Sequence, residues 1–179
     1  MSNIILMNKS YNDELALPTV MNYCIGNHST KKKCFSWGGT GVDTSNIDTA
    51  INDMYKVKNY FSKTNGKQLY HIVITIYSDT DSVDENYLKR KYKKESNICD
   101  AIVKPISKLI YDMGFQNCFF RHGDSSIVHA HFVINSVNWM DGRKLTNFKS
   151  FVFAIKQFAL RQLYVNLGEL VYRTGEEIE

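Results

Sequence analysis

Hydrophobic and polar positions repeat along the chain with two different periods, and these periods predict where helices and strands lie. Apolar residues recur every three or four positions over 15–25, 45–63 and 147–167, a pattern typical of helices with one buried face. A fourth helix is expected over 85–113, where a basic stretch passes into an amphipathic one. Pro105 lies inside this segment and is expected to kink it.

Short runs rich in β-branched and aromatic residues predict strands at 4–7, 69–77, 116–122 and 128–137. The last two are separated by five residues, a spacing that favours an antiparallel hairpin. The Gly-rich segment 38–41 is expected to be a loop or a hairpin instead. This order of elements predicts an α/β sandwich of the α+β class, with an antiparallel central sheet, helices packed on one face and an open face for a site.

Cap and turn residues mark the ends of the predicted helices. Ser45 is expected to cap the N-terminus of the helix over 45–63, and the Asn65-Gly66 turn to end it. Thr146 is expected to cap the last helix in the same way.

The composition fits one compact domain over residues 1–179. Hydrophobic residues make up 44% of the chain and only two residues are proline, which excludes a disordered or collagen-like chain. No repeat or low-complexity linker divides the sequence. The 22 basic and 18 acidic residues give a net charge of +4, which permits nucleic acid as a partner without requiring it.

The cysteines and the N-terminal sequence indicate the cellular compartment in which the protein is expected. Cys24, Cys34, Cys99 and Cys118 form no CxxC pair, which argues against a zinc knuckle. The N-terminal hydrophobic run is too short for a signal peptide, and no run approaches the ~20 apolar residues of a membrane span. We therefore expect a cytoplasmic protein with reduced thiols and no membrane insertion.

Three of the five histidines lie within ten residues of each other. His129 and His131 alternate with apolar residues along a predicted strand, so both imidazoles point away from the face that helices cover. His122 ends the preceding strand, just across the hairpin turn. The three imidazoles then form an N₃ metal site whose open positions are typical of a catalytic metal. The alternative is three ordinary polar residues on a solvated sheet face.

Two further residues are expected to orient these imidazoles by hydrogen bonding. Asp124 follows His122 closely, and Asn135 lies on the histidine face of the same predicted strand. His71, on the strand 69–77, either lines this face or is packed inside. Imidazole alone does not select the metal, so several divalent ions are expected to bind.

The pattern His-x-Asp-x₄-His-x-His-x₃-Asn, formed by His122, Asp124, His129, His131 and Asn135, resembles the third motif of relaxases. These are the mobilization endonucleases of the His-hydrophobic-His superfamily. Residues 70–73 look like the middle motif of this family. Residues 22–25, followed by the lysines 31–33, are similar to its first motif, in which a tyrosine at the end of an N-terminal helix precedes basic residues. The resemblance spans roughly residues 20–165, which is then the core of the domain, with an acidic C-terminal tail.

The resemblance implies a mechanism and the residues that perform it. Relaxases nick one DNA strand at the transfer origin of a plasmid or transposon, through a tyrosine that becomes a 5′-phosphotyrosine. Tyr23 is then the nucleophile, with Tyr11 as its main rival. His122, His129 and His131 hold a divalent metal ion, Mn²⁺ or Mg²⁺. A phenol with a pKa of about 10 is a poor nucleophile at neutral pH, so a nearby cation suits this chemistry.

The resemblance also implies the partners. These are single-stranded and origin DNA, accessory relaxosome proteins and a coupling protein, in a bacterial cytoplasm. Nine residues are candidates for contacts with DNA: Lys31, Lys32, Lys33, His71, Lys89, Arg90, Lys91, Arg143 and Lys144. Relaxase domains commonly continue into further regions, so the chain is either an N-terminal piece of a longer protein or a minimal member of the family.

Two alternatives stay open at the level of sequence. A rolling-circle replication initiator of the same superfamily shares the chemistry, and only the DNA target separates the two. A non-catalytic DNA-binding module keeps the fold but loses the reaction, and the intact histidine triad argues against it.

Overall fold

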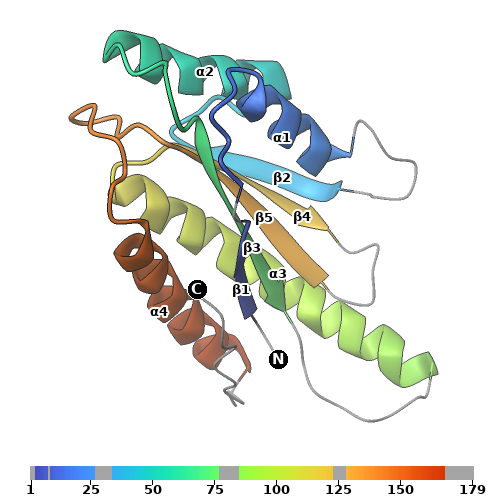
Figure 1. Ribbon diagram of the computed structural model, residues 1–179. Coiled ribbons are helices and arrows are strands. Elements are labelled where there is room, and N and C mark those ends of the chain that lie inside the picture. The colour runs from blue at the N-terminus through green and yellow to red at the C-terminus, as the bar shows by residue number, and fades with distance from the viewer. Residues whose placement is uncertain (1–2, 8, 27–33, 77–84, 123–127, 168–179) are drawn as a thin grey trace.

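The computed structural model describes residues 3–7, 9–26, 34–76, 85–122 and 128–167. Strands and helices follow each other along this part of the chain (Figure 1) in this order: β1 (Asn3–Leu6), α1 (Ala16–Ile25), β2 (Cys34–Thr40), α2 (Ile47–Tyr60), β3 (Leu69–Ile76), α3 (Glu85–Asp112), β4 (Asn117–His122), β5 (Val128–Asn135) and α4 (Phe148–Leu167). The α+β class is confirmed.

The strands form one antiparallel sheet in the order β1-β3-β5-β4-β2. β4 and β5 are neighbours, as expected of a hairpin, and His122 pairs with His129 across them. β5 is the central strand, because β3 pairs with its other edge. The strand that carries two of the candidate histidines is therefore held on both sides by a backbone ladder.

Helices α3 and α4 cover one face of the sheet. The apolar residues expected to face helices do so: Val128, Ala130, Phe132 and Ile134 pack with β3, α3 and α4 in one core. Pro105 lies inside the continuous α3. Within the described residues, no helix combines the length and the apolar character that a bilayer crossing requires.

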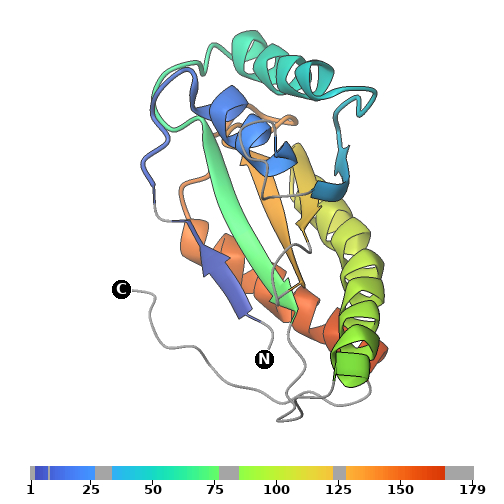
Figure 2. The ribbon, with the colours of Figure 1, turned by 90° about the vertical axis from the view of Figure 1, so that its right-hand side faces the viewer.

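Helices α1 and α2 lie on the other face of the sheet, which also carries the candidate histidines (Figures 1 and 2). Leu17 and Met21 of α1 and Met54 of α2 share a second core with Phe120 and Val133 of the sheet. The expected open face is thus partly covered, since the apolar sides of these two helices also need a partner. The site lies where this second layer ends, beside the C-terminus of α1.

The Gly-rich segment expected to be a loop forms the end of strand β2. A Cβ on Gly38 would lie 2.7 Å from the Phe119 ring, and one on Gly39 would lie 2.6 Å from the backbone oxygen of Asn117. These glycines permit close packing of β2 against β4, which is a known use of glycine within strands. The prediction was wrong because glycine marks both turns and close backbone contacts.

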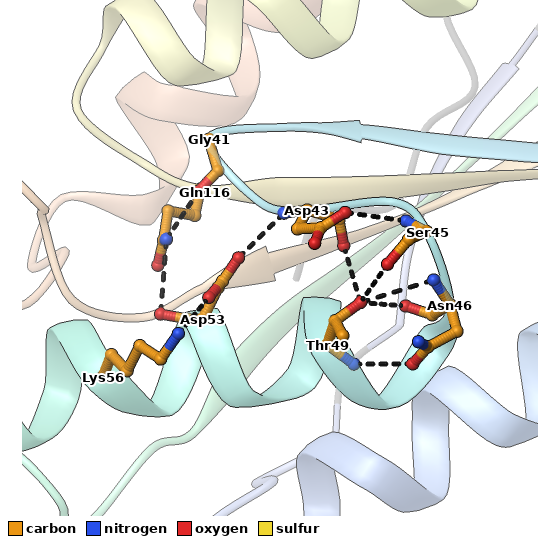
Figure 3. Close-up of polar contacts among 8 residues, drawn as sticks. All are labelled: Gly41, Asp43, Ser45, Asn46, Thr49, Asp53, Lys56 and Gln116. Atoms are coloured by element: carbon orange, nitrogen blue, oxygen red, sulfur yellow. Dashed lines mark hydrogen bonds and ion pairs between the residues drawn. The ribbon is translucent and has the colours of Figure 1, made fainter.

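The N-terminus of α2 differs by one residue from the prediction. Asn46, not Ser45, is the N-cap, and its side chain accepts a hydrogen bond from the backbone N–H of Thr49 at 2.9 Å. The Thr49 hydroxyl in turn accepts from the backbone N–H of Asn46, which completes a capping box (Figure 3). The helix ends at Tyr60, five residues before the Asn65-Gly66 turn.

Candidate active site

The structure brings the three clustered histidines together at one end of the sheet. Their ring centroids lie 4.7 Å (His122 to His131), 5.1 Å (His129 to His131) and 5.2 Å (His122 to His129) apart. One possible ligand nitrogen from each lies within 4.8 Å of the others. His122 and His131 are buried, with 1% and 7% of their surfaces exposed, whereas His129 is half-buried. The cluster thus has a buried inner side and a more accessible outer side.

A contact with α1 orients the imidazole of His122. Its Nε2 lies 2.5 Å from the backbone oxygen of Cys24. A carbonyl oxygen only accepts hydrogen bonds, so Nε2 carries the hydrogen and donates it. In the neutral ring, the lone pair is then on Nδ1. Metal-bound histidines are commonly held by such a second hydrogen bond.

His131 is in contact with a fourth histidine. Its Nδ1 lies 2.8 Å from Nε2 of His71 on β3, and Nδ1 of His71 lies 3.2 Å from the Tyr11 hydroxyl. Burial, aided by the charge of Lys9, lowers the pKa of His71 to about 4, so this ring is neutral at pH 7. If His71 donates its one hydrogen to Tyr11, it accepts from His131, whose Nε2 then has the lone pair.

The sequence left two alternatives for His71, a place on the histidine face or a place in the interior. Both hold, because His71 lies on the histidine face and is also buried. Its side chain is only 3% exposed. It lies beneath His131 rather than on a surface that DNA touches, so the expectation of a DNA contact does not fit its position.

Tyr23 lies beside the triad, in the last turn of α1. Its ring meets His131 edge to face, with centroids 6.3 Å apart and an interplanar angle of 87°, and 43% of its surface is exposed. Gly26 ends the helix in a left-handed conformation (φ 92°), and its N–H donates to the carbonyls of Asn22 and Tyr23. The sequence-predicted nucleophile and the sequence-predicted metal ligands are thus neighbours, although about 100 residues separate them.

The other tyrosines considered have different surroundings. Tyr11 is half-buried, contacts His71, and has its pKa raised mainly by burial. The Tyr55 hydroxyl donates to the backbone oxygen of Glu14 at 2.7 Å. Tyr60 lies on the surface with its ring against Phe61. None of these three rings has a contact with the triad among those that the structure describes.

Asn135 is not brought to the histidines. It lies on the same face as His131 but four residues along the strand, a separation of roughly 13 Å. Its side chain donates to the backbone oxygen of Met54 and to Gln116, and accepts from the N–H of Val137. Asn135 thus ties β5 to α2, and the expectation that it orients an imidazole is corrected. Asp124 lies outside the described residues.

The candidate DNA contacts fall in separate places. Lys31, Lys32 and Lys33 lie outside the described residues. Lys89, Arg90 and Lys91 belong to α3 and lie near its start. Arg143 is 85% exposed and pairs with Asp141 at 2.6 Å. The ammonium group of Lys144 donates to the backbone oxygens of Asn65 and Lys67, which indicates a structural contact.

Sequence reasoning missed the role of Cys24 and left that of His71 open. The carbonyl that holds His122 belongs to the backbone of Cys24, and a backbone group leaves no trace in the sequence. His71 lies in the segment 70–73 that resembles the middle relaxase motif, which was a usable signal.

Comparison with known proteins identifies the family. A search of curated proteins finds no match. A family model described as "Relaxase: MobA/VirD2-like, nuclease domain" matches residues 23–163. The match covers well over half of the chain, from Tyr23 through the three histidines and into α4. This chain therefore belongs to the MobA/VirD2-like relaxases and carries their DNA-nicking nuclease domain.

Proposed function

We propose that this domain nicks one DNA strand at a transfer origin with Tyr23 as the nucleophile. The observation that carries the proposal is the position of an exposed tyrosine ring 6.3 Å from His131. The contact between the Cys24 carbonyl and His122 fixes the backbone next to this tyrosine to the same cluster. Nucleophile and triad are thereby held as one unit.

The reaction is a transesterification. The Tyr23 oxygen forms a bond to the phosphorus of the scissile phosphate, and the bond from phosphorus to the 3′ oxygen breaks. The phenol loses its proton, and the 3′ oxygen gains one and leaves as a 3′-hydroxyl. One phosphodiester replaces another, so the reverse reaction reseals the strand. The exposure of the Tyr23 ring leaves room for a phosphate to approach.

His122, His129 and His131 are the residues that would hold a divalent metal ion. The fit rests on three nitrogen donors within 4.8 Å of one another and on the hydrogen bonds that orient two of them. Such an ion, when bound, supplies positive charge for a non-bridging phosphate oxygen in the transition state. An all-nitrogen donor set suits Mn²⁺ better than Mg²⁺, because Mg²⁺ prefers oxygen ligands.

The start of α3 is the favoured DNA contact. Arg121 forms an ion pair with Asp100 of α3 at 2.9 Å, and the next residue is His122. The first turns of α3 extend beyond the sheet at this same end (Figure 1). The start of α3, which includes Lys89, Arg90 and Lys91, therefore lies at the same end of the sheet as the triad, on the opposite face. Arg143 follows the opposite end of β5, about 20 Å from His131 along the strand direction.

The proposal places the domain in plasmid or transposon mobilization in a bacterial cytoplasm. The origin sequence would be single-stranded where it is cut, and accessory relaxosome proteins and a coupling protein would be its further partners. The support for these points is the family to which the chain belongs.

The test is a cleavage screen with oligonucleotides tiled across candidate origins, in the presence of Mn²⁺. We expect a covalent adduct at the 5′ end of one fragment, and peptide mass spectrometry to place it on Tyr23. Tyr23→Phe should form no adduct and still bind the DNA. Tyr11→Phe removes the same hydroxyl group from the rival tyrosine and should still form the adduct. An adduct in Tyr23→Phe would overturn the assignment.

A further inference from the structure

We infer that Cys24, His71 and His131 form a second metal site, selective for thiophilic ions such as Zn²⁺, whose occupancy removes His131 from the triad. The site goes beyond the proposed function, and rests on it only because His131 is also a proposed triad ligand. The Cys24 thiol takes no part in the reaction of Tyr23.

The three side chains already lie close together in the interior. The Cys24 sulfur is 3.8 Å from Nε2 of His71, and that nitrogen is 2.8 Å from Nδ1 of His131. All three residues are buried, and their possible ligand atoms lie within 4.8 Å of one another. Ligand bonds of about 2.3 Å to sulfur and 2.0 Å to nitrogen give ligand separations of roughly 3.3 to 3.6 Å in a tetrahedral site. The separations of 3.8 Å and 2.8 Å each differ from this range by about half an ångström or less.

The donor chemistry separates this site from the triad. A thiolate with two imidazoles selects zinc and similar soft ions, whereas Mn²⁺ and Mg²⁺ bind thiolates poorly. The triad offers nitrogen alone. Imidazole also binds Zn²⁺, so the two sites differ in that only one of them contains a thiolate, although they share one residue.

A neutral imidazole has only one lone pair, so His131 can serve only one site at a time. With its hydrogen on Nδ1, it donates to His71 and offers Nε2 to the triad. With its hydrogen on Nε2, it offers Nδ1 to the ion shared with Cys24 and His71. Occupancy of the second site therefore disables the first.

The protons balance. The ion binds as the Cys24 thiol loses its proton to solvent, as thiolate ligands require. His71 keeps its hydrogen on Nδ1, facing the Tyr11 hydroxyl 3.2 Å away. In effect, the metal ion replaces the hydrogen that His71 and His131 share in the metal-free protein.

The test uses Co²⁺ as a spectroscopic substitute for Zn²⁺, since a cobalt–thiolate bond gives a strong charge-transfer absorption in the near ultraviolet. We expect the reduced full chain to show this band with one Co²⁺ bound, and Cys24→Ala to lack it. Cys99→Ala is the matched control: it loses the same buried thiol, but from α3 on the opposite face of the sheet. It should keep the band. Circular dichroism verifies that each variant is folded.

Two further variants separate the sites. His71→Ala should lose the band, because it removes a ligand of the thiolate site only. His122→Ala should keep it, because His122 belongs to the triad only. A band that survives in Cys24→Ala, or that disappears in His122→Ala, would overturn the proposal. Wild type that binds two Co²⁺ ions at once would exclude the competition for His131.

A functional readout follows from the same competition. Zn²⁺ added to the Mn²⁺-dependent reaction should inhibit adduct formation. Cys24→Ala, compared with its own zinc-free rate, should need at least about tenfold more Zn²⁺ for half-inhibition. The absorption band does not require nicking, so failure of the proposed nicking function would leave the spectroscopic result unaffected, and equal zinc sensitivity would count against the competition alone.

Discussion

At the scale of single residues, the hydrogen-bond partners of His122 and His131 determine which nitrogen of each ring can bind a metal. His122 donates from Nε2 to the carbonyl of Cys24, which leaves Nδ1. His131 contacts His71 through Nδ1, and in the tautomer that donates there its lone pair is on Nε2. The triad is thus defined as much by the groups behind it as by its own three side chains.

Replacing the group behind His131 tests this point. His71→Ala removes the acceptor for His131 and should weaken Mn²⁺ binding by roughly 10- to 100-fold, the usual cost of losing such a partner. His71→Gln keeps an acceptor oxygen near the same position and should restore most of the affinity. Isothermal titration calorimetry measures both. Equal affinity in His71→Ala and wild type would contradict a positioning role for His71.

A second residue of interest is the fully buried Lys58 of α2. Its ammonium group donates to the backbone oxygen and the side-chain oxygen of Gln68. Burial, with a smaller effect of the charge of Lys144, lowers the pKa of Lys58 to about 7. A neutral amine still has two hydrogens, so both hydrogen bonds survive deprotonation.

Lys58 should make the stability depend on pH in a defined window. Between about pH 7 and the unfolded value near 10.4, the unfolded chain binds more protons at this residue than the folded chain does. The free energy of unfolding should therefore rise with pH across this window, and below it Lys58 should lower the stability by a constant amount that does not change with pH. Lys58→Met should flatten the rise in urea unfolding experiments. Lys56→Met, on the exposed side of the same helix, should leave the rise in place.

At the scale of elements, the C-terminal turn of α1 positions Tyr23, the proposed nucleophile. The left-handed Gly26 ends the helix one turn after Tyr23, and the Cys24 carbonyl ties this turn to the end of β4. The geometry of this turn therefore sets where Tyr23 lies relative to His122.

Two glycine variants separate this local effect from stability. Gly26→Ala and Gly66→Ala both place a side chain at positive φ, 92° and 73°, and each should lower the free energy of unfolding by about 1 to 2 kcal/mol. Gly66 has room for a Cβ, since its nearest atom would be the Lys144 ammonium nitrogen at 3.6 Å. Only Gly26→Ala should also slow adduct formation, measured on the cleaved oligonucleotide. Equal rates in the two variants would show that the turn does not position Tyr23.

At the scale of the whole molecule, the sheet separates two helical layers. The three clustered histidines and Tyr23 lie at one end of this sheet. α3 and α4 form a core on one face, and α1 and α2 form another on the face that carries the histidines. Figure 2 shows the two layers on either side of the sheet. The start of α3 and the end of α1 both lie at the end of the sheet that carries the triad, on opposite faces (Figure 1), so the proposed catalytic and DNA-binding groups share that end.

We expect the basic residues at the start of α3 to account for more of the salt dependence of DNA binding than basic residues elsewhere. Replacing Lys89, Arg90 and Lys91 together by alanine should reduce the slope of log affinity against log salt by up to about 2 for single-stranded DNA. Replacing Arg143, Lys149 and Lys156 removes the same charge elsewhere and should change the slope little. Fluorescence anisotropy at several salt concentrations measures both. An equal loss in the two variants would contradict a DNA path along α3.

The sequence predictions were mostly correct where neighbouring residues fix a feature, and they failed mainly where contacts between distant residues fix it. The alternation of His129 and His131 with Ala130 and Phe132 assigned the faces of β5, because side chains on a strand alternate whatever surrounds them. The cap of α2 was missed by one residue, because Ser45 and Asn46 are both good caps. Asn135 was assigned to the site from its face alone, and the distance along the strand placed it elsewhere.

The sequence by itself determined the α+β class, the antiparallel pairing of β4 with β5, the shared face of the histidines and the resemblance to relaxases. Each of these rests on neighbours in the chain or on a short motif. The tertiary structure decided that α1 and α2 cover part of the histidine face, that the Cys24 carbonyl orients His122, and that His71 lies behind His131. These contacts join residues roughly 50 to 100 positions apart, and only the packing of helices on the sheet brings such residues together.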